Sequence, residues 1–155
     1  MRFLHMTRLK ALFPLCILML LGCGTSDDRF YGITFQNASE DHILFYMADI
    51  HAPSAYPDTV IVEEAFSRAL GPGSNEIRYA DTEWREVLAQ LPSDTLSVFI
   101  VDQTVVFLEG WESIKEDYLV LKRYDLSIQD LETLNYQLTY PPDERMQGMK
   151  VFPPD

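Results

Sequence analysis

A basic segment followed by a short apolar run opens the chain. Residues 1–10 carry three bases and no acid, and residues 11–21 are largely apolar but contain Pro14. A helix that crosses the hydrocarbon of a membrane needs about 20 apolar residues, and this run is about half that length. Such a pairing is typical of a secretory signal peptide. We therefore predict that residues 1–22 are removed and that the fold is built from the rest of the chain.

The apolar run ends in Leu20-Leu21-Gly22-Cys23, which resembles the lipobox of bacterial lipoproteins. The resemblance implies that the Cys23 thiol is acylated, with palmitate among the fatty acids, and that Cys23 becomes the first mature residue. Two or more acyl chains, each buried CH2 contributing about 0.8 kcal/mol, hold a protein stably at a membrane. The alternative is an ordinary signal peptide in which Cys23 is incidental, but its cleavage needs small residues. We expect the membrane to be a partner through Cys23.

Processing also removes any chance of an intramolecular disulfide. Cys16 lies in the predicted signal peptide and Cys23 is expected to be acylated, so no pair of thiols is left. The signal peptide contains three bases and no acid, so the mature chain has 24 acids against 9 bases, a formal charge of −15. This charge excludes a nucleic-acid binder that neutralises phosphates. Residues 30–155 are predicted to form one globular domain that depends on its hydrophobic core alone.

Residues 23–29 are predicted to be the lipidated cysteine and a short polar tether. Within the tether, Ser26-Asp27-Asp28 resembles the export signal that directs lipoproteins of the Bacteroidota to the cell surface. The alternative interpretation is a solvated acidic linker. We expect an outer-membrane lipoprotein that faces the cell surface if this signal is used, and the periplasm otherwise.

Apolar patterning predicts seven or eight short strands. Residues 29–36 and 42–48, joined by a turn-prone segment, are predicted to pair as a β-hairpin, and the second is apolar on both faces. Pro141-Pro142 is expected to end the last strand and leave an acidic tail. The other strands are predicted at 59–62, 76–80, 95–101, 105–108, 119–124 and 136–140.

Three short helices are predicted between these strands. The first begins at an Asp81 cap and ends at Pro92, and the third begins with a capping box of Ser127 and Asp130. The second covers residues 111–118. The first helix buries an apolar stripe made of Trp84, Val87, Leu88 and Leu91. The fold class is therefore mainly β or α+β, with an antiparallel, sandwich-like sheet and about three short helices.

Compact catalytic signatures are missing from the sequence, which contains no G-x-S-x-G, H-E-x-x-H, P-loop, G-x-G-x-x-G or C-x-x-C motif. We predict that the chain is not an enzyme and needs no cofactor. Asp49 and His51 offer two metal ligands without a third, and Glu63-Glu64 lies in no calcium-loop pattern. No metal site is predicted, and His42 is expected to be a solvated residue at a strand edge.

Two further predictions concern a loop tyrosine and two threonines. Tyr56 lies in a Pro-flanked loop and is a candidate ligand contact, since loops carry many binding residues. Asp58-Thr59-Val60 and Asp94-Thr95-Leu96 resemble the O-glycosylation pattern of exported proteins of the Bacteroidota. The resemblance implies Thr59 and Thr95 as candidate glycan acceptors, whereas Asp-Thr is also a natural start of a strand.

The following patterns lie between residues 94 and 154: Asp94-Thr95-Leu96-Ser97-Val98-Phe99-Ile100, Leu121-Lys122-Arg123-Tyr124-Asp125-Leu126-Ser127, Asp130-Leu131, Leu134-Asn135 and Tyr140-Pro141-Pro142. Through these patterns and the N-terminal anchor, the chain resembles a family of small, uncharacterised lipoproteins of gut Bacteroidota. The resemblance implies an envelope location and a shared domain, and it brings no known activity.

Two functions from different classes follow from these features. The first is a membrane-anchored envelope lipoprotein that serves as a non-enzymatic structural or interaction module. The second is a surface binding protein for a glycan, a peptide or a cation. The sequence names no protein or glycan partner for either of them.

Overall fold

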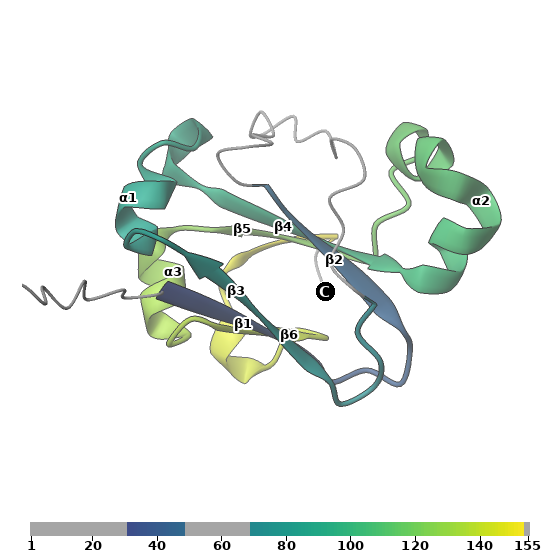
Figure 1. Ribbon diagram of the computed structural model, residues 1–155, viewed down its shortest axis with the longest axis horizontal. Helices are drawn as coiled ribbons and strands as arrows, with labels where there is room; N and C mark the ends of the chain where they lie inside the picture. Colours follow the sequence, from purple (N-terminus) through teal and green to yellow (C-terminus); the bar gives the residue numbers. More distant parts are fainter. Residues whose placement is uncertain (1–30, 49–68, 154–155) are drawn as a thin grey trace, which may run out of the picture.

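The computed structural model describes residues 31–48 and 69–153 (Figure 1). The predicted signal peptide, the tether and the strand at 59–62 lie outside these residues. In chain order the elements are β1 (Tyr31–Asn37), β2 (Ile43–Ala48), β3 (Asn75–Ala80), α1 (Trp84–Leu88), the 3-10 helix η1 (Pro92–Asp94), β4 (Leu96–Asp102), α2 (Gln103–Glu116), β5 (Lys122–Leu126), α3 (Ile128–Thr133), β6 (Gln137–Tyr140), the 3-10 helix η2 (Glu144–Met146) and β7 (Lys150–Phe152).

The strands of the described part form two sheets. One sheet has the order β3-β1-β6 and the other has the order β2-β4-β5-β7. Every pair is antiparallel except β1 with β6, which is parallel. With three α-helices beside them, the sheets confirm the predicted α+β class and its mainly antiparallel, sandwich-like character.

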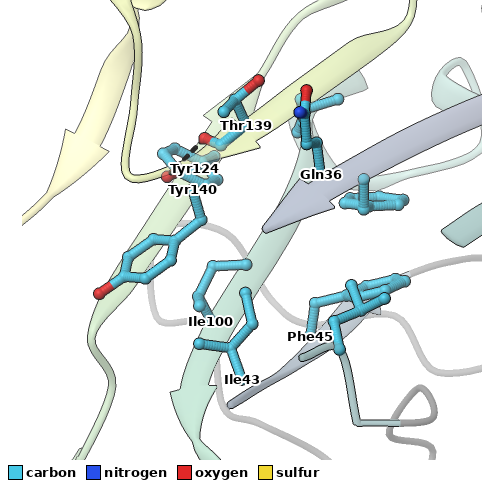
Figure 2. Close-up of a pocket in the computed structure, with 10 residues that line it drawn as sticks. Gln36, Ile43, Phe45, Ile100, Tyr124, Thr139 and Tyr140 are labelled. Carbon is cyan, nitrogen blue, oxygen red and sulfur yellow. Dashed lines mark hydrogen bonds between the residues drawn. The ribbon is translucent and has the colours of Figure 1, made fainter. Parts of the chain in front are cut away.

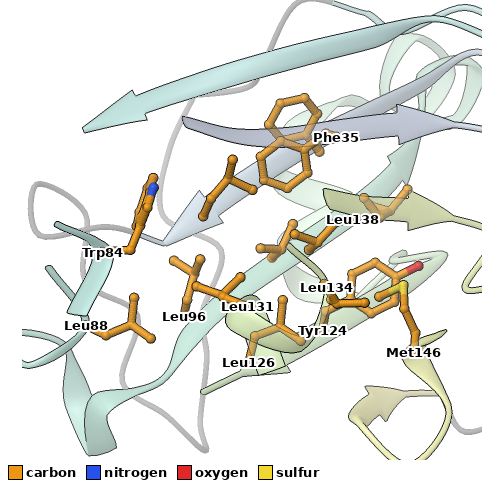
Figure 3. Close-up of a cluster of buried hydrophobic side chains, with 14 of the residues drawn as sticks. Phe35, Trp84, Leu88, Leu96, Tyr124, Leu126, Leu131, Leu134, Leu138 and Met146 are labelled. Atoms are coloured by element: carbon orange, nitrogen blue, oxygen red, sulfur yellow. The ribbon is translucent and has the colours of Figure 1, made fainter. Parts of the chain in front are cut away.

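The main hydrophobic core lies between the two sheets (Figure 3). Phe35 of β1 stacks on Phe45 of β2 with ring centroids 4.0 Å apart, which joins one sheet to the other. Helices α1 and α3 close this core at one end of the molecule (Figure 1). A second cluster lies on the outer face of the four-stranded sheet, where Tyr46, Phe99 and Val101 pack with Ile114 of α2. Strand β2 is therefore buried on both faces, as predicted.

The predicted hairpin of the first two strands is wrong, because β1 and β2 belong to different sheets. The physical reason is the fully buried amide of Asn37 at the end of β1. Its Nδ2 donates to the carbonyl oxygens of Asp41 at 2.7 Å and Leu70 at 2.9 Å. Its Oδ1 accepts from the backbone N–H of Ser39 at 2.9 Å and from the Ser39 hydroxyl at 2.6 Å. These bonds satisfy the backbone of a connection that crosses between the sheets.

The predicted strand at 105–108 is also wrong, since these residues belong to helix α2. The Asp102 carboxylate accepts from the backbone N–H groups of Thr104 at 2.6 Å and Val105 at 3.3 Å. A carboxylate in this position satisfies N–H groups of a helical first turn, so the chain leaves the sheet at the end of β4. Of the predicted helix at 111–118, residues 111–116 form the second half of α2, after a break at Gly110, and the last two residues lie beyond the helix.

The other two helices differ less from prediction. Helix α1 begins after Glu83 and not at Asp81, and no side chain caps it. Its predicted stripe, residues 84, 87, 88 and 91, is buried as expected. Helix α3 has the predicted capping box, in which Ser127 Oγ accepts from Asp130 N–H and the Asp130 carboxylate accepts from Ser127 N–H.

The segment after Pro142 is not a tail. It forms η2 and then β7, which pairs with β5 through Val151 opposite Tyr124. Met146 is buried in the main core, and Val151 packs against it. The prolines therefore end β6, while the chain returns to complete the four-stranded sheet.

We predict that Asn37→Ala lowers the free energy of unfolding by about 1–3 kcal/mol, because the carbonyl oxygens of Asp41 and Leu70 each lose a hydrogen bond from a buried amide. Asn37→Asp should cost more, since it turns a carboxylate oxygen toward the same carbonyl oxygens. Urea denaturation of the full chain measures both changes. An Asn37→Ala value within about 0.5 kcal/mol of the parent, the range of an ordinary surface substitution, would contradict the role given to this amide.

Candidate functional site

Most of the site residues predicted from sequence lie outside the described residues. The structure therefore does not place the anchor, the surface-export signal, the first glycan acceptor or the loop tyrosine. These residues are Cys23, Ser26, Asp27, Asp28, Thr59 and Tyr56, together with His51 and Glu63-Glu64.

Two predicted residues are described. Thr95 is half-buried between η1 and β4, and its hydroxyl donates to the carbonyl oxygen of Ser93 at 2.8 Å. Its modification stays a prediction. His42 is exposed just before β2, as predicted.

Across the described residues, no group of three or more histidine, cysteine, aspartate or glutamate side chains is placed to hold a metal ion. No helix in the same part of the chain is long and apolar enough to cross a membrane.

A small gap lies between the two sheets (Figure 2). Ile43, Phe45, Ile100 and the ring of Tyr124 border it, and the Tyr124 hydroxyl donates to the carbonyl oxygen of Thr139 at 3.3 Å. Its volume is about 10 Å³, which is about the space of one water molecule. This gap is a packing defect of the core and not a ligand site.

A larger cleft opens at the end of the domain that α1 and α3 close. Its volume is about 460 Å³, within the range of about 300–1,000 Å³ that is usual for small-molecule pockets. The walls come from the start of β1, the start of α1, the end of α3 and the connection into β6. The lining residues are Tyr31, Gly32, Glu83, Trp84, Arg85, Glu132 and Tyr136.

Two interactions hold the walls of this cleft in place. The buried Trp84 indole donates from Nε1 to the carbonyl oxygen of Tyr31 at 3.1 Å, which fixes the start of α1 against β1. Arg85 of α1 forms an ion pair with Glu132 of α3. The ion pair is partly exposed and adds little stability, but it sets the position of a guanidinium and a carboxylate on the rim.

The backbone at Tyr136 is unusual. Helix α3 ends in a Schellman motif, in which Tyr136 N–H donates to Leu131 O at 2.8 Å and Asn135 N–H donates to Glu132 O at 3.0 Å. The motif accounts for the left-handed φ of 51° at Asn135. Tyr136 follows with φ 57°, a conformation that tyrosine rarely adopts. The sequence thus keeps a tyrosine ring on the cleft at a cost in backbone strain.

The charges of the cleft act on the Tyr136 phenol. Burial raises the pKa of Tyr136 above its ordinary value of 10.0, and the carboxylates of Glu132 and Glu83 raise it further. Arg85 opposes this effect and lowers the pKa. At neutral pH the phenol is therefore protonated and can donate a hydrogen bond.

We predict that Glu132→Gln lowers the pKa of Tyr136, since it removes a negative charge that disfavours the phenolate. Arg85→Gln should raise this pKa, because it removes the opposing positive charge. A pH titration of tyrosine ¹³Cζ resonances measures both, with Tyr136 assigned by its loss in Tyr136→Phe. Glu86→Gln, on the exposed side of α1, is the control that should change nothing. Shifts in the same direction for Glu132→Gln and Arg85→Gln would contradict the assignment.

A second surface feature is the exposed apolar pair Phe107 and Leu108, which we call the tip of α2. Phe107 is 87% exposed and Leu108 is 70% exposed, although large apolar side chains are usually buried. Gly110 follows with φ 76° and ψ 168°, a conformation that is essentially restricted to glycine. It divides α2 into two parts and leaves the apolar tip on the first part.

The two features lie far apart. The start of β1, with α1 and α3 beside it, lies at one end of the longest axis, and α2 lies at the other (Figure 1). The cleft is therefore close to the point where the chain comes from the predicted anchor, and the apolar tip is remote from it.

Sequence reasoning missed both features. The alternating pattern predicts a strand at Tyr136, and nothing local indicates that this residue lines the same cleft as Tyr31, which is distant in the chain. Phe107 and Leu108 were placed on a strand as well, although Asp102 is the signal for a helix at this position.

No protein-family model, curated protein or solved structure matches this chain.

Proposed function

We propose that the chain is an envelope lipoprotein, anchored at the outer membrane through Cys23, whose domain is a non-enzymatic interaction module. The lipobox, the acidic tether and the missing catalytic motifs support this function. Surface display through Ser26-Asp27-Asp28 is part of the proposal.

One observation carries the interaction role: the exposed apolar tip of α2 and the start of β1 lie at opposite ends of the longest axis (Figure 1). The chain from Cys23 to Tyr31 spans at most about 29 Å, even when fully extended. An anchor at Cys23 therefore keeps the β1 end near the membrane and presents Phe107 and Leu108 away from it.

The surroundings of the tip define the chemistry of its partner. Glu109, next to Leu108 in the chain, is exposed. Glu112 and Glu116 are exposed on the part of α2 that follows Gly110, where Glu112 pairs with Lys115 at 3.0 Å. An apolar patch with a polar rim is typical of a protein contact. The partner is accordingly an envelope protein with an apolar pocket and basic residues around it, because complementary charge guides association.

The anchor is tested on intact cells. We expect the mature native chain to carry the mass of its acyl groups and to be digested by added protease, whereas Cys23→Ala should lose both the acyl mass and the membrane association. If the mature chain is acylated but protected from protease, only the proposal of surface display is contradicted. A mature chain without acyl groups would contradict the lipoprotein proposal itself.

The interaction surface is tested separately by photo-crosslinking in living cells. Benzoylphenylalanine in place of Phe107 should give a discrete adduct, and the same probe at the exposed Gln129 of α3 is the control at the other end. Combining the probe with Glu109→Lys and Glu112→Lys should abolish the adduct, since both changes reverse the charge around the tip. Equal adducts at both positions, or an adduct that survives the charge reversal, would contradict the proposal.

A further inference from the structure

We propose that the cleft between β1, α1 and the α3–β6 connection binds a neutral pyranose ring, with Tyr31 and Tyr136 against the sugar face and Arg85 and Glu132 on its hydroxyl groups. This site is independent of the α2 tip, which lies at the other end of the molecule.

The two tyrosines supply flat surfaces in an open cleft. Tyr31 and Tyr136 are both half-buried and both line the cleft. The face of an aromatic ring carries partial negative charge, and the C–H groups on one face of a pyranose carry partial positive charge. Stacking of a sugar on a tyrosine therefore combines apolar contact with a weak electrostatic attraction.

The ion pair supplies hydrogen bonds for hydroxyl groups. A hydroxyl group is both donor and acceptor, a guanidinium only donates, and a carboxylate only accepts. Adjacent hydroxyl groups of a sugar can thus bond to Arg85 and Glu132 together. The side chains of Arg85 and Glu132 are 59% and 45% exposed, so both can be reached from the cleft.

The charge balance of the cleft selects against other small ligands. Glu83 and Glu132 outnumber Arg85, so a phosphate or an acidic sugar meets net repulsion. An apolar ligand would remove water from the ion pair without giving it new hydrogen bonds, which is costly. A neutral ring with many hydroxyl groups is not repelled by the carboxylates, and it can replace the hydrogen bonds that the ion pair loses with water.

The backbone of Tyr136 is the independent observation in favour of a site. The Schellman motif requires a left-handed residue at Asn135 and not at Tyr136. Strained conformations of this kind gather at ligand-binding positions. A ligand that uses the Tyr136 ring gives a reason for keeping a tyrosine where φ is 57°.

The test is saturation-transfer NMR followed by calorimetry on the mature acylated chain, in a detergent that contains no sugar. The probes are methyl glucopyranoside, methyl galactopyranoside and methyl mannopyranoside, with methyl glucuronide as the anionic counterpart. At about 10 mM, a sugar with millimolar affinity occupies most of the sites. We expect at least one neutral probe to bind and to exceed the glucuronide in affinity.

Variants then locate the binding. Tyr136→Ala should weaken binding about tenfold, the loss of one stacked ring with its hydroxyl group. Tyr136→Phe keeps the ring and should weaken it less, which also guards against a variant that fails to fold. Arg85→Ala should weaken it as well. Phe107→Ala removes an exposed aromatic ring at the opposite end and should leave binding unchanged.

Three results would overturn the inference. The first is that none of the three neutral probes binds. The second is that the glucuronide binds as tightly as its neutral counterpart. The third is that binding persists unchanged in Tyr136→Ala.

Discussion

The buried amide of Asn37 is the interaction on which the arrangement of the two sheets depends. A short loop after a strand normally returns the chain to the same sheet, because the backbone then finds its hydrogen bonds in the ladder. Here one side chain provides those bonds for Asp41, Ser39 and Leu70. The chain can therefore cross from the three-stranded sheet to the four-stranded sheet, and Phe35 and Phe45 meet face to face between them.

The side chain of Asp102 determines how the chain continues after strand β4 of the four-stranded sheet. Strand β4 is buried along nearly its whole length, and Asp102 is its last residue. By satisfying the first N–H groups of α2, Asp102 ends the sheet and directs the chain outward. The exposed tip of α2 thus follows from one capping carboxylate. The walls of the cleft are instead held by the hydrogen bond from Trp84 to Tyr31 and by the ion pair of Arg85 with Glu132.

These two residues also mark the limit of prediction from sequence. The buried strand β4, the stripe on α1 and the capping box of Ser127 and Asp130 were predicted, because each depends on residues close together in the chain. The pairing of β1 with β3 and β6, and the return of β7 to β5, depend on contacts between distant residues. Alternation along a strand shows which face is buried, but it does not show which strand lies beside it.

The same limit applies to the candidate site. Trp84 was recognised as a core residue, but the hydrogen bond from its indole to Tyr31, which holds one wall of the cleft, joins segments far apart in the chain. Tyr136 fits an alternating strand pattern, and its left-handed backbone becomes visible only once the end of α3 is seen. A pattern that is consistent with a strand can thus conceal a strained residue at the wall of a cleft.

Features that lower the stability or the solubility of the domain indicate where its function lies. It has no disulfide to rely on within residues 23–155, since Cys23 is the only cysteine there, and stability in such a domain is a small difference between large terms. The strained backbone of Tyr136 at one end reduces the stability of the domain. The exposed Phe107 and Leu108 at the other end reduce its solubility. Natural sequences depart from local rules mainly where function requires it. Both of these departures lie at the ends of the molecule, the strained tyrosine at the cleft and the exposed apolar pair on α2, and these ends are where the proposed ligand and the proposed partner would bind.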